Sequence, residues 1–87
     1  MKKLESKRVI VVDYQRKKYL SSVGNPSYKL FMQDLETGEY LRGETITNGA
    51  CGYESFDTLK YKQIPIVIKF HYTRKTNKLI IDFIERA

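Results

Sequence analysis

Residues 64–73, IPIVIKFHYT, show the strictest pattern in the chain: large apolar or aromatic side chains at every second position, with polar Lys69 and His71 between them. Side chains in a β-strand point alternately to its two faces, so this pattern predicts a strand with one face in a hydrophobic core. Pro65 is compatible with it because it lies at the start of the strand. The expected core-facing residues are Ile64, Ile66, Ile68, Phe70 and Tyr72.

Four other segments also predict strands. RVIVVDY, residues 8–14, is rich in β-branched side chains and apolar on both faces, as in a central or barrel strand. Residues 28–35 and 40–47 flank a short link, residues 36–39, which contains a glycine and favours a hairpin. The turn RKTNK leads into the last strand, LIIDFIE. Its core-facing residues are expected to be Leu79, Ile81 and Phe83.

Three features interrupt the strand patterns. Residues 15–27, QRKKYLSSVGNPS, predict a long loop because they are polar and contain Gly-Asn-Pro. Residues 48–63 begin with turn signals, and residues 55–62 suit one or two helical turns with Ser55 as the N-cap. Gly43, inside the third predicted strand, indicates a bulge or a sharp bend. Such a bend would help a small sheet curl into a barrel.

The order of elements is therefore three strands, an irregular or short-helical link, and two strands. This order over residues 8–85 resembles the OB-fold, a five-stranded Greek-key barrel. The fold class is thus expected to be mainly β: a small, highly curved antiparallel sheet or barrel, OB-like, with a short helix between strands three and four. An SH3-like barrel would give a similar order of secondary-structure elements. Residues 1–7 are expected to be a flexible basic N-terminus, and residues 8–87 one domain.

Composition argues against several functional classes. The 87 residues contain one cysteine, Cys51, and one histidine, so neither an intramolecular disulfide nor a zinc site of four Cys and His ligands is expected. The chain has no phosphate-binding glycine loop and no acidic pair with catalytic spacing. We therefore expect a non-enzyme without cofactor or metal. Without an apolar signal region or a membrane-length apolar run, the protein is expected to be soluble and cytoplasmic.

The positive charge is unevenly distributed. The net charge is +6, and residues 1–20 hold seven basic and two acidic side chains, while residues 60–78 hold six basic and no acidic ones. The segment between them, residues 21–59, is acidic. In OB-folds the loops between strands one and two and between strands four and five flank the ligand-binding face. The resemblance therefore implies that the two basic stretches line one cleft.

Aromatic side chains on that cleft could stack on nucleic-acid bases. If Tyr28, Leu30 and Met32 point inward, then Lys29, Phe31 and Gln33 point outward, with Tyr40 and Arg42 beside Phe31. A register slip of one residue would reverse this assignment. The candidate nucleic-acid-binding residues are Arg16, Lys17, Lys18, Tyr19, Lys29, Phe31, Arg42, Lys69, His71, Arg74, Lys75 and Lys78.

Three functions are compatible with these observations. The first is a domain that binds single-stranded DNA or RNA with little sequence specificity. The second is a protein-protein interaction module, an adaptor or inhibitor, that docks on an acidic partner. The third is an oligomeric structural component, whose interface would contain the apolar residues expected to face outward. Those residues are Val9, Val11, Val67 and Ile80.

Overall fold

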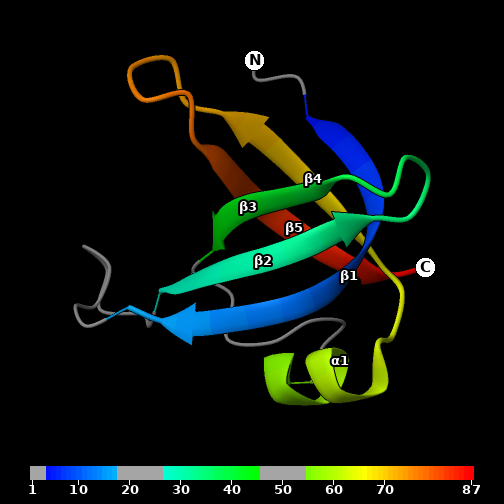
Figure 1. Ribbon diagram of the computed structural model, residues 1–87. Coiled ribbons are helices and arrows are strands. Elements are labelled where there is room, and N and C mark those ends of the chain that lie inside the picture. Colours follow the sequence, from blue (N-terminus) through cyan, green and yellow to red (C-terminus); the bar gives the residue numbers. More distant parts are fainter. Residues whose placement is uncertain (1–3, 18–26, 46–54) are drawn as a thin grey trace.

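The computed structural model describes residues 4–17, 27–45 and 55–87, which form five strands and one short helix (Figure 1). The mainly β class and the short helix between the third and fourth strands are confirmed. The elements are β1 (Glu5–Arg16), β2 (Tyr28–Asp34), β3 (Tyr40–Thr45), α1 (Phe56–Lys62), β4 (Ile66–Tyr72) and β5 (Leu79–Arg86).

The strands close into a barrel in the order β1-β2-β3-β5-β4, and β4 pairs back onto β1. The long strand β1 makes this closure feasible, because its first half pairs with β4 and its second half pairs with β2. The β3–β5 contact is parallel, through Glu44 and Ile80, while the other four pairings are antiparallel. This small closed barrel is consistent with the OB-like arrangement expected from the element order.

Alternating side chains of β2 and β4 fill the barrel. Leu30 and Met32 of β2, and Ile66, Ile68 and Phe70 of β4, are at most 1% exposed. Their neighbours along each strand point outward, as the period of two requires. The predicted inward faces of these two strands are therefore confirmed, except that Tyr72, at the end of β4, is exposed.

Helix α1 packs below the barrel, on the side of β1 (Figure 1). Ser55 is its N-cap, and the Ser55 hydroxyl accepts a hydrogen bond from the Thr58 backbone N–H at 3.2 Å. Phe56 and Leu59 face the core, where the Phe56 ring makes an edge contact with Tyr28 at 5.0 Å between centroids. The predicted helix and its predicted cap are both confirmed.

Two β-bulges change which side chains face inward. In β1 the register shifts between Val11 and Asp13, so Val12 is the extra residue. Val9 and Val11 are fully buried, and the expectation that they face outward is wrong. Because β1 is apolar on both faces, its alternation does not show which face is the inner one. Tyr14 packs against the core because the extra residue Val12 shifts the alternation by one position, which turns the Tyr14 side chain inward.

The second bulge lies in β5, where Lys69 pairs with Phe83 but the next residue, Phe70, pairs with Ile81. The extra residue is Asp82. After it the alternation is reversed, so Ile84 packs against the core and Phe83 is 58% exposed. The prediction that Phe83 faces the core is therefore wrong, because it assumed an unbroken period of two.

Gly43 has a different role from the predicted bulge. The β2–β3 register runs through it without a shift, so of the two predicted alternatives, a bulge or a sharp bend, the bulge is wrong in this pairing. A Cβ atom at Gly43 would lie 2.7 Å from Cδ2 of Leu79 and 3.2 Å from Cε of Met32. The glycine therefore lets β3 approach the core side chains of β5 and β2 closely.

The strand ends also differ from the sequence boundaries. Residues 5–7, assigned by sequence to the flexible N-terminus, pair with β4, and Gln15 and Arg16, assigned to a loop, pair with β2. The turn between β2 and β3 is organised by Asp34, whose Oδ1 accepts hydrogen bonds from the backbone N–H groups of Glu36 and Thr37. Gly38 in this turn has a φ of 77°, which suits glycine.

Candidate nucleic-acid interface

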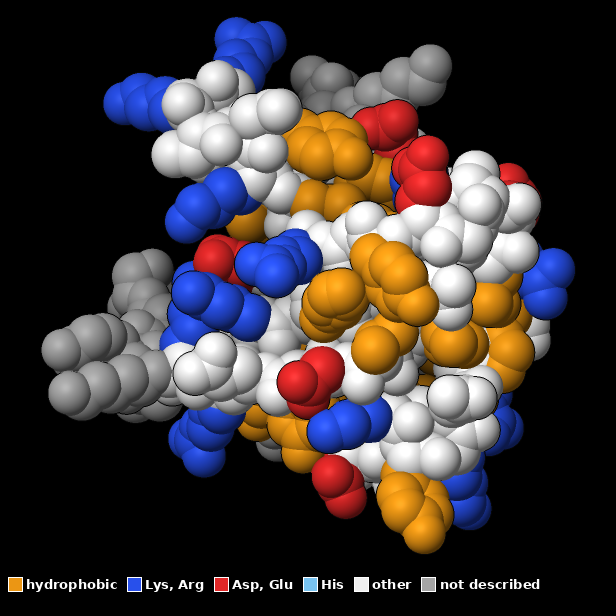
Figure 2. Space-filling model, viewed as in Figure 1, with side chains coloured by type: hydrophobic (Ala, Val, Ile, Leu, Met, Phe, Trp, Pro, Cys, Tyr) orange, Lys and Arg blue, Asp and Glu red, His pale blue; other side chains and the backbone are white. Residues whose placement is uncertain are grey.

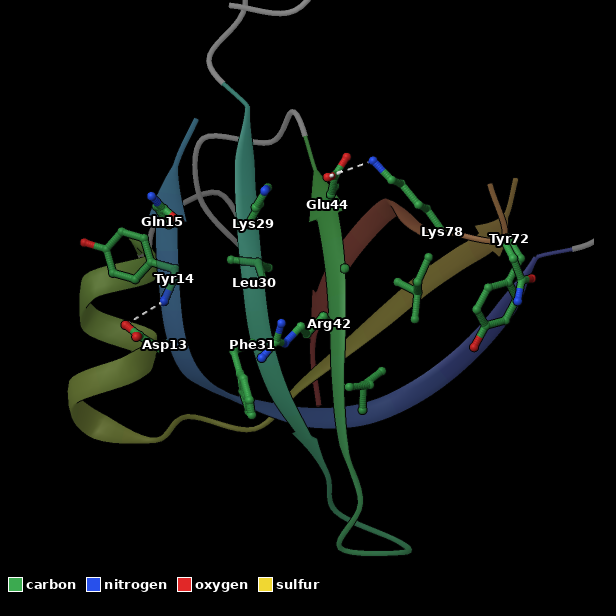
Figure 3. A pocket seen from close by; sticks show the side chains of 14 residues that line it. Asp13, Tyr14, Gln15, Lys29, Leu30, Phe31, Arg42, Glu44, Tyr72 and Lys78 are labelled. Atoms are coloured by element: carbon green, nitrogen blue, oxygen red, sulfur yellow. Dashed lines mark hydrogen bonds and ion pairs between the residues drawn. The ribbon is translucent and has the colours of Figure 1, made fainter. Parts of the chain in front are cut away.

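An open groove of about 600 Å³ crosses the barrel surface from β1 to the β4–β5 hairpin (Figure 3). Its lining comes from four parts of the chain: residues 13–15 of β1, residues 29–31 of β2, residues 41–44 of β3, and Tyr72 with residues 77–79 of the hairpin. The groove therefore runs across the strands. This is the face on which OB-folds bind their ligands.

Phe31 and Arg42 line the groove, and Tyr40 packs against Phe31 without being one of the lining residues. The Phe31 ring lies 5.3 Å from the Tyr40 ring between centroids, and Cζ of Arg42 lies 5.5 Å from the Phe31 centroid. Tyr40 is 61% exposed and Phe31 is half-buried. The predicted register of β2 is confirmed, since Lys29, Phe31 and their cross-strand neighbour Arg42 lie on the outer side.

Basic side chains gather over the end of β3 and the adjacent β4–β5 loop, beside the apolar group over β2 and β3 (Figure 2). Here Glu44 of β3 is paired with two lysines that are far apart in sequence. Nζ of Lys17 lies 2.8 Å from its carboxylate, and Nζ of Lys78 lies 3.8 Å from it. Lys29 is the cross-strand partner of Glu44 in the β2–β3 register. One lysine from each basic stretch, Lys17 and Lys78, is therefore paired with the same carboxylate, although only Lys78 is among the residues that line the groove.

The charge state of Glu44 follows from these neighbours. Partial burial disfavours its ionised form and acts to raise its pKa. The hydrogen bond from Lys17 and the positive charges of Lys17, Lys78 and Lys29 outweigh this effect and hold the pKa of Glu44 below its usual value. Glu44 is thus ionised at neutral pH, and it neutralises part of the positive charge at this end of the groove.

The β4–β5 loop presents two more of the predicted cations to solvent. Arg74 and Lys75 lie in the turn and are exposed. Hydrogen bonds of the threonine side chains stabilise the turn. The Thr73 and Thr76 hydroxyls are 2.6 Å apart, and the Lys78 backbone N–H donates to the Thr73 hydroxyl at 3.1 Å. In the segment FHYTRKTNK, residues 70–72 therefore end β4, and residues 73–78 form a hydrogen-bonded turn whose basic side chains are exposed.

Arg16 is exposed at the end of β1. Two of the predicted residues, Lys18 and Tyr19, lie outside the described residues.

The structure does not bring Lys69 and His71 into the groove. Both point to the outer side of β4, where Lys69 pairs with Glu85 at 3.2 Å and Nδ1 of His71 lies 2.6 Å from Oδ2 of Asp82. The Asp82 bulge places that carboxylate opposite the histidine. Sequence reasoning placed His71 on the outer face of its strand, but the acidic partner depends on a bulge that the sequence pattern does not reveal.

Two further groove residues, Tyr14 and Tyr72, were not among the predicted site residues, and Tyr72 was predicted to face the core. They lie on opposite sides of the groove, on β1 and β4 (Figure 3). The Tyr14 hydroxyl donates to Oδ1 of Asp57 at 3.3 Å, and its pKa is raised by burial and by the negative charge of Asp57. Both residues lie near the ends of their strands, where side chains pass from the core to solvent. This position was the sequence signal that they could line a groove.

No protein-family model, curated protein or solved structure gives a significant match to this chain. Among residues 4–17, 27–45 and 55–87, no His, Cys, Asp and Glu side chains form a group of three or more that could hold a metal ion. In that same part of the chain, no helix has the length and hydrophobicity needed to cross a membrane.

Proposed function

We propose that this domain is a non-catalytic, OB-like module that binds single-stranded DNA or RNA with little sequence preference. The observation that supports the proposal is the groove with its immediate surroundings. Phe31, Arg42, Lys29 and Lys78 line it, Tyr40 packs against Phe31, and Lys17, just after β1, pairs with Glu44 of the lining. Aromatic rings that stack on bases, beside cations that follow the phosphates, are the two parts that single-strand binding requires.

Neither the aromatic rings nor the lysines distinguish one base sequence from another. Every base has a flat face that can stack on an aromatic ring, and each stack contributes roughly 1–3 kcal/mol. Lysine contacts a phosphate as a point charge and does not read the base. A duplex keeps its bases stacked on one another, so Phe31 and Tyr40 would be without partners. We therefore expect single strands to bind more tightly than duplexes.

The alternative function, docking on an acidic protein partner, has a structural observation of its own. The outer side of β4 and β5 carries Phe83, which is exposed and lies opposite Lys69 in the strand register. An exposed aromatic side chain beside a cation suits a protein interface. This surface is separate from the groove residues, so variants of Phe83 and variants of Phe31 distinguish the two functions.

The test is a titration of the protein into a fluorescently labelled oligonucleotide of about 20 nucleotides, single-stranded and duplex in parallel, at several salt concentrations. Each lysine–phosphate contact adds roughly −0.7 to the slope of log K against log salt for a single strand. Contacts by Lys17, Lys29, Lys78, Arg74 and Lys75 predict a slope of about −3.5. Absence of binding to the single strand at low salt would refute the proposed function and direct attention to the Phe83 surface.

A further inference from the structure

Glu44 is surrounded by three lysines from three separate elements. Lys17 follows β1, Lys29 lies on β2, and Lys78 belongs to the β4–β5 loop. All three lower the pKa of Glu44 through their charge. One carboxylate cannot neutralise three ammonium groups, so this end of the groove keeps an excess of positive charge around a single anion position.

We infer that Lys17, Lys29 and Lys78 form one phosphate subsite, and that the Glu44 carboxylate occupies it in the free protein. A backbone phosphate would take over the lysine contacts that Glu44 makes. This inference rests on the proposed function and adds to it the place where the nucleic-acid backbone enters the groove. Lysine is a common phosphate ligand, and charge-assisted hydrogen bonds to phosphate are among the stronger ones.

The geometry of the pairs favours such an exchange. The Lys17–Glu44 pair is at hydrogen-bonding distance, but Lys78 is 3.8 Å away and contributes its charge without a hydrogen bond. The Lys78 side chain is 56% exposed, whereas that of Glu44 is 22% exposed. Lys78 can therefore reach a phosphate at the groove surface.

The backbone of Glu44 is fixed on both sides, by Lys29 of β2 and by Ile80 of β5. Only its side chain can move away when a phosphate binds. A carboxylate from an acidic peptide would replace one carboxylate with another and gain little. The resident glutamate is therefore expected to favour a phosphate over a carboxylate as ligand, and under the proposed function that phosphate belongs to the nucleic-acid backbone.

The experiment compares Glu44→Gln with Glu36→Gln, which removes the same charge from the exposed β2–β3 turn, outside the groove. We expect Glu44→Gln to increase single-strand affinity at least about threefold at low salt, because the carboxylate that competes with a phosphate for Lys17 and Lys78 is removed. Glu36→Gln should leave the affinity nearly unchanged.

A second background separates a local effect from a general one. In Lys17→Ala/Lys78→Ala protein, the gain from Glu44→Gln should be clearly smaller than in the wild-type background, and an undiminished gain would overturn the subsite. Glu44→Asp keeps the negative charge on a shorter side chain, so its gain in single-strand affinity should be smaller than that of Glu44→Gln. It is the variant to measure if Glu44→Gln does not fold.

The outcomes also separate this inference from the proposed function. If wild-type protein binds the single strand but Glu44→Gln gives no gain, the subsite is refuted and the proposed function stands. If neither protein binds, both are refuted.

Discussion

Lys7 donates a hydrogen bond from Nζ to Oδ2 of Asp34 at 2.9 Å, which joins the start of β1 to the β2–β3 turn. The other carboxylate oxygen of Asp34 accepts the backbone N–H groups of Glu36 and Thr37. Asp34 is buried, so its charge is stabilised mainly by these donors. The hydrogen bond from Lys7, followed by that from the Glu36 N–H, lowers the pKa of Asp34 below its ordinary 3.8.

This lowered pKa predicts a pH dependence of stability. A carboxyl group whose pKa is lower in the folded state stabilises the fold above its unfolded pKa, and that stabilisation is lost as pH falls through the folded pKa. We expect Asp34→Asn to lower Tm at pH 7, and the difference from wild type to shrink as pH falls from about 4 towards 2. Thermal unfolding followed by circular dichroism measures it. A pH-independent difference would contradict the prediction, and Glu36→Gln is the matched exposed control.

The close approach of Gly43 to Leu79 predicts a steric effect. A Cβ at Gly43 would lie 2.7 Å from Cδ2 of Leu79, so Gly43→Ala requires the core to shift and should destabilise the protein by about 1–3 kcal/mol. For a domain of this size each kcal/mol corresponds to a fall in Tm of roughly 4–8 °C. Chemical denaturation gives the free energy of unfolding directly.

A double-mutant cycle tests the cause of that loss. Leu79→Ala removes the clashing methyl groups, so Gly43→Ala should cost clearly less in the Leu79→Ala background than in the wild type. Equal costs in the two backgrounds would show that the clash with Leu79 is not the source of the effect.

The stacking surface makes a prediction that is independent of charge. Phe31→Ala should weaken single-strand binding about fivefold to a hundredfold, as expected for loss of a stacked base, without changing the salt slope. Tyr61→Ala is the matched control, since Tyr61 is an aromatic residue of α1 that is 88% exposed and does not line the groove. Equal loss in the two variants, measured by anisotropy, would show that the groove does not hold the bases.

The exposed cations of the β4–β5 turn should affect binding through charge alone. Arg74→Ala/Lys75→Ala is expected to make the salt slope less steep by about 1.4, at roughly 0.7 per lost contact. Arg8→Ala/Lys62→Ala removes two exposed basic side chains outside the groove, and it should leave the slope nearly unchanged. The slope of log K against log salt is the measurement, and similar slopes in the two double variants would argue against a role for the turn.

Alternation in the sequence was sufficient to predict the parts of the fold that follow a simple period. It placed β2 and β4 in the right register, and this put Phe31 beside Arg42 on the outer surface. The helix followed from Ser55 and the apolar spacing after it. These signals are local, so they do not depend on how the barrel closes.

The errors came from features that depend on closure. A closed barrel of five strands needs strong local curvature, and the bulges at Val12 and Asp82 provide bends of this kind at the cost of regular alternation. Phe83 is therefore outside, against its sequence pattern. Glu44 was missed as a groove residue because its partners Lys17 and Lys78 come near it only when β1 and the β4–β5 hairpin are brought together.

The parallel β3–β5 contact, through Glu44 and Ile80, has a consequence for motion in this barrel. Between the described residues of β3 and β5 the register holds a single pair, so this seam is where the barrel should open most easily, and its amide hydrogens should exchange with solvent sooner than those of β2 or β4. The groove spans this seam, from Lys29 on one side to Lys78 on the other. A bound nucleic-acid strand would therefore hold the two sides of this seam together. Slower amide exchange at the seam would then detect binding without a label.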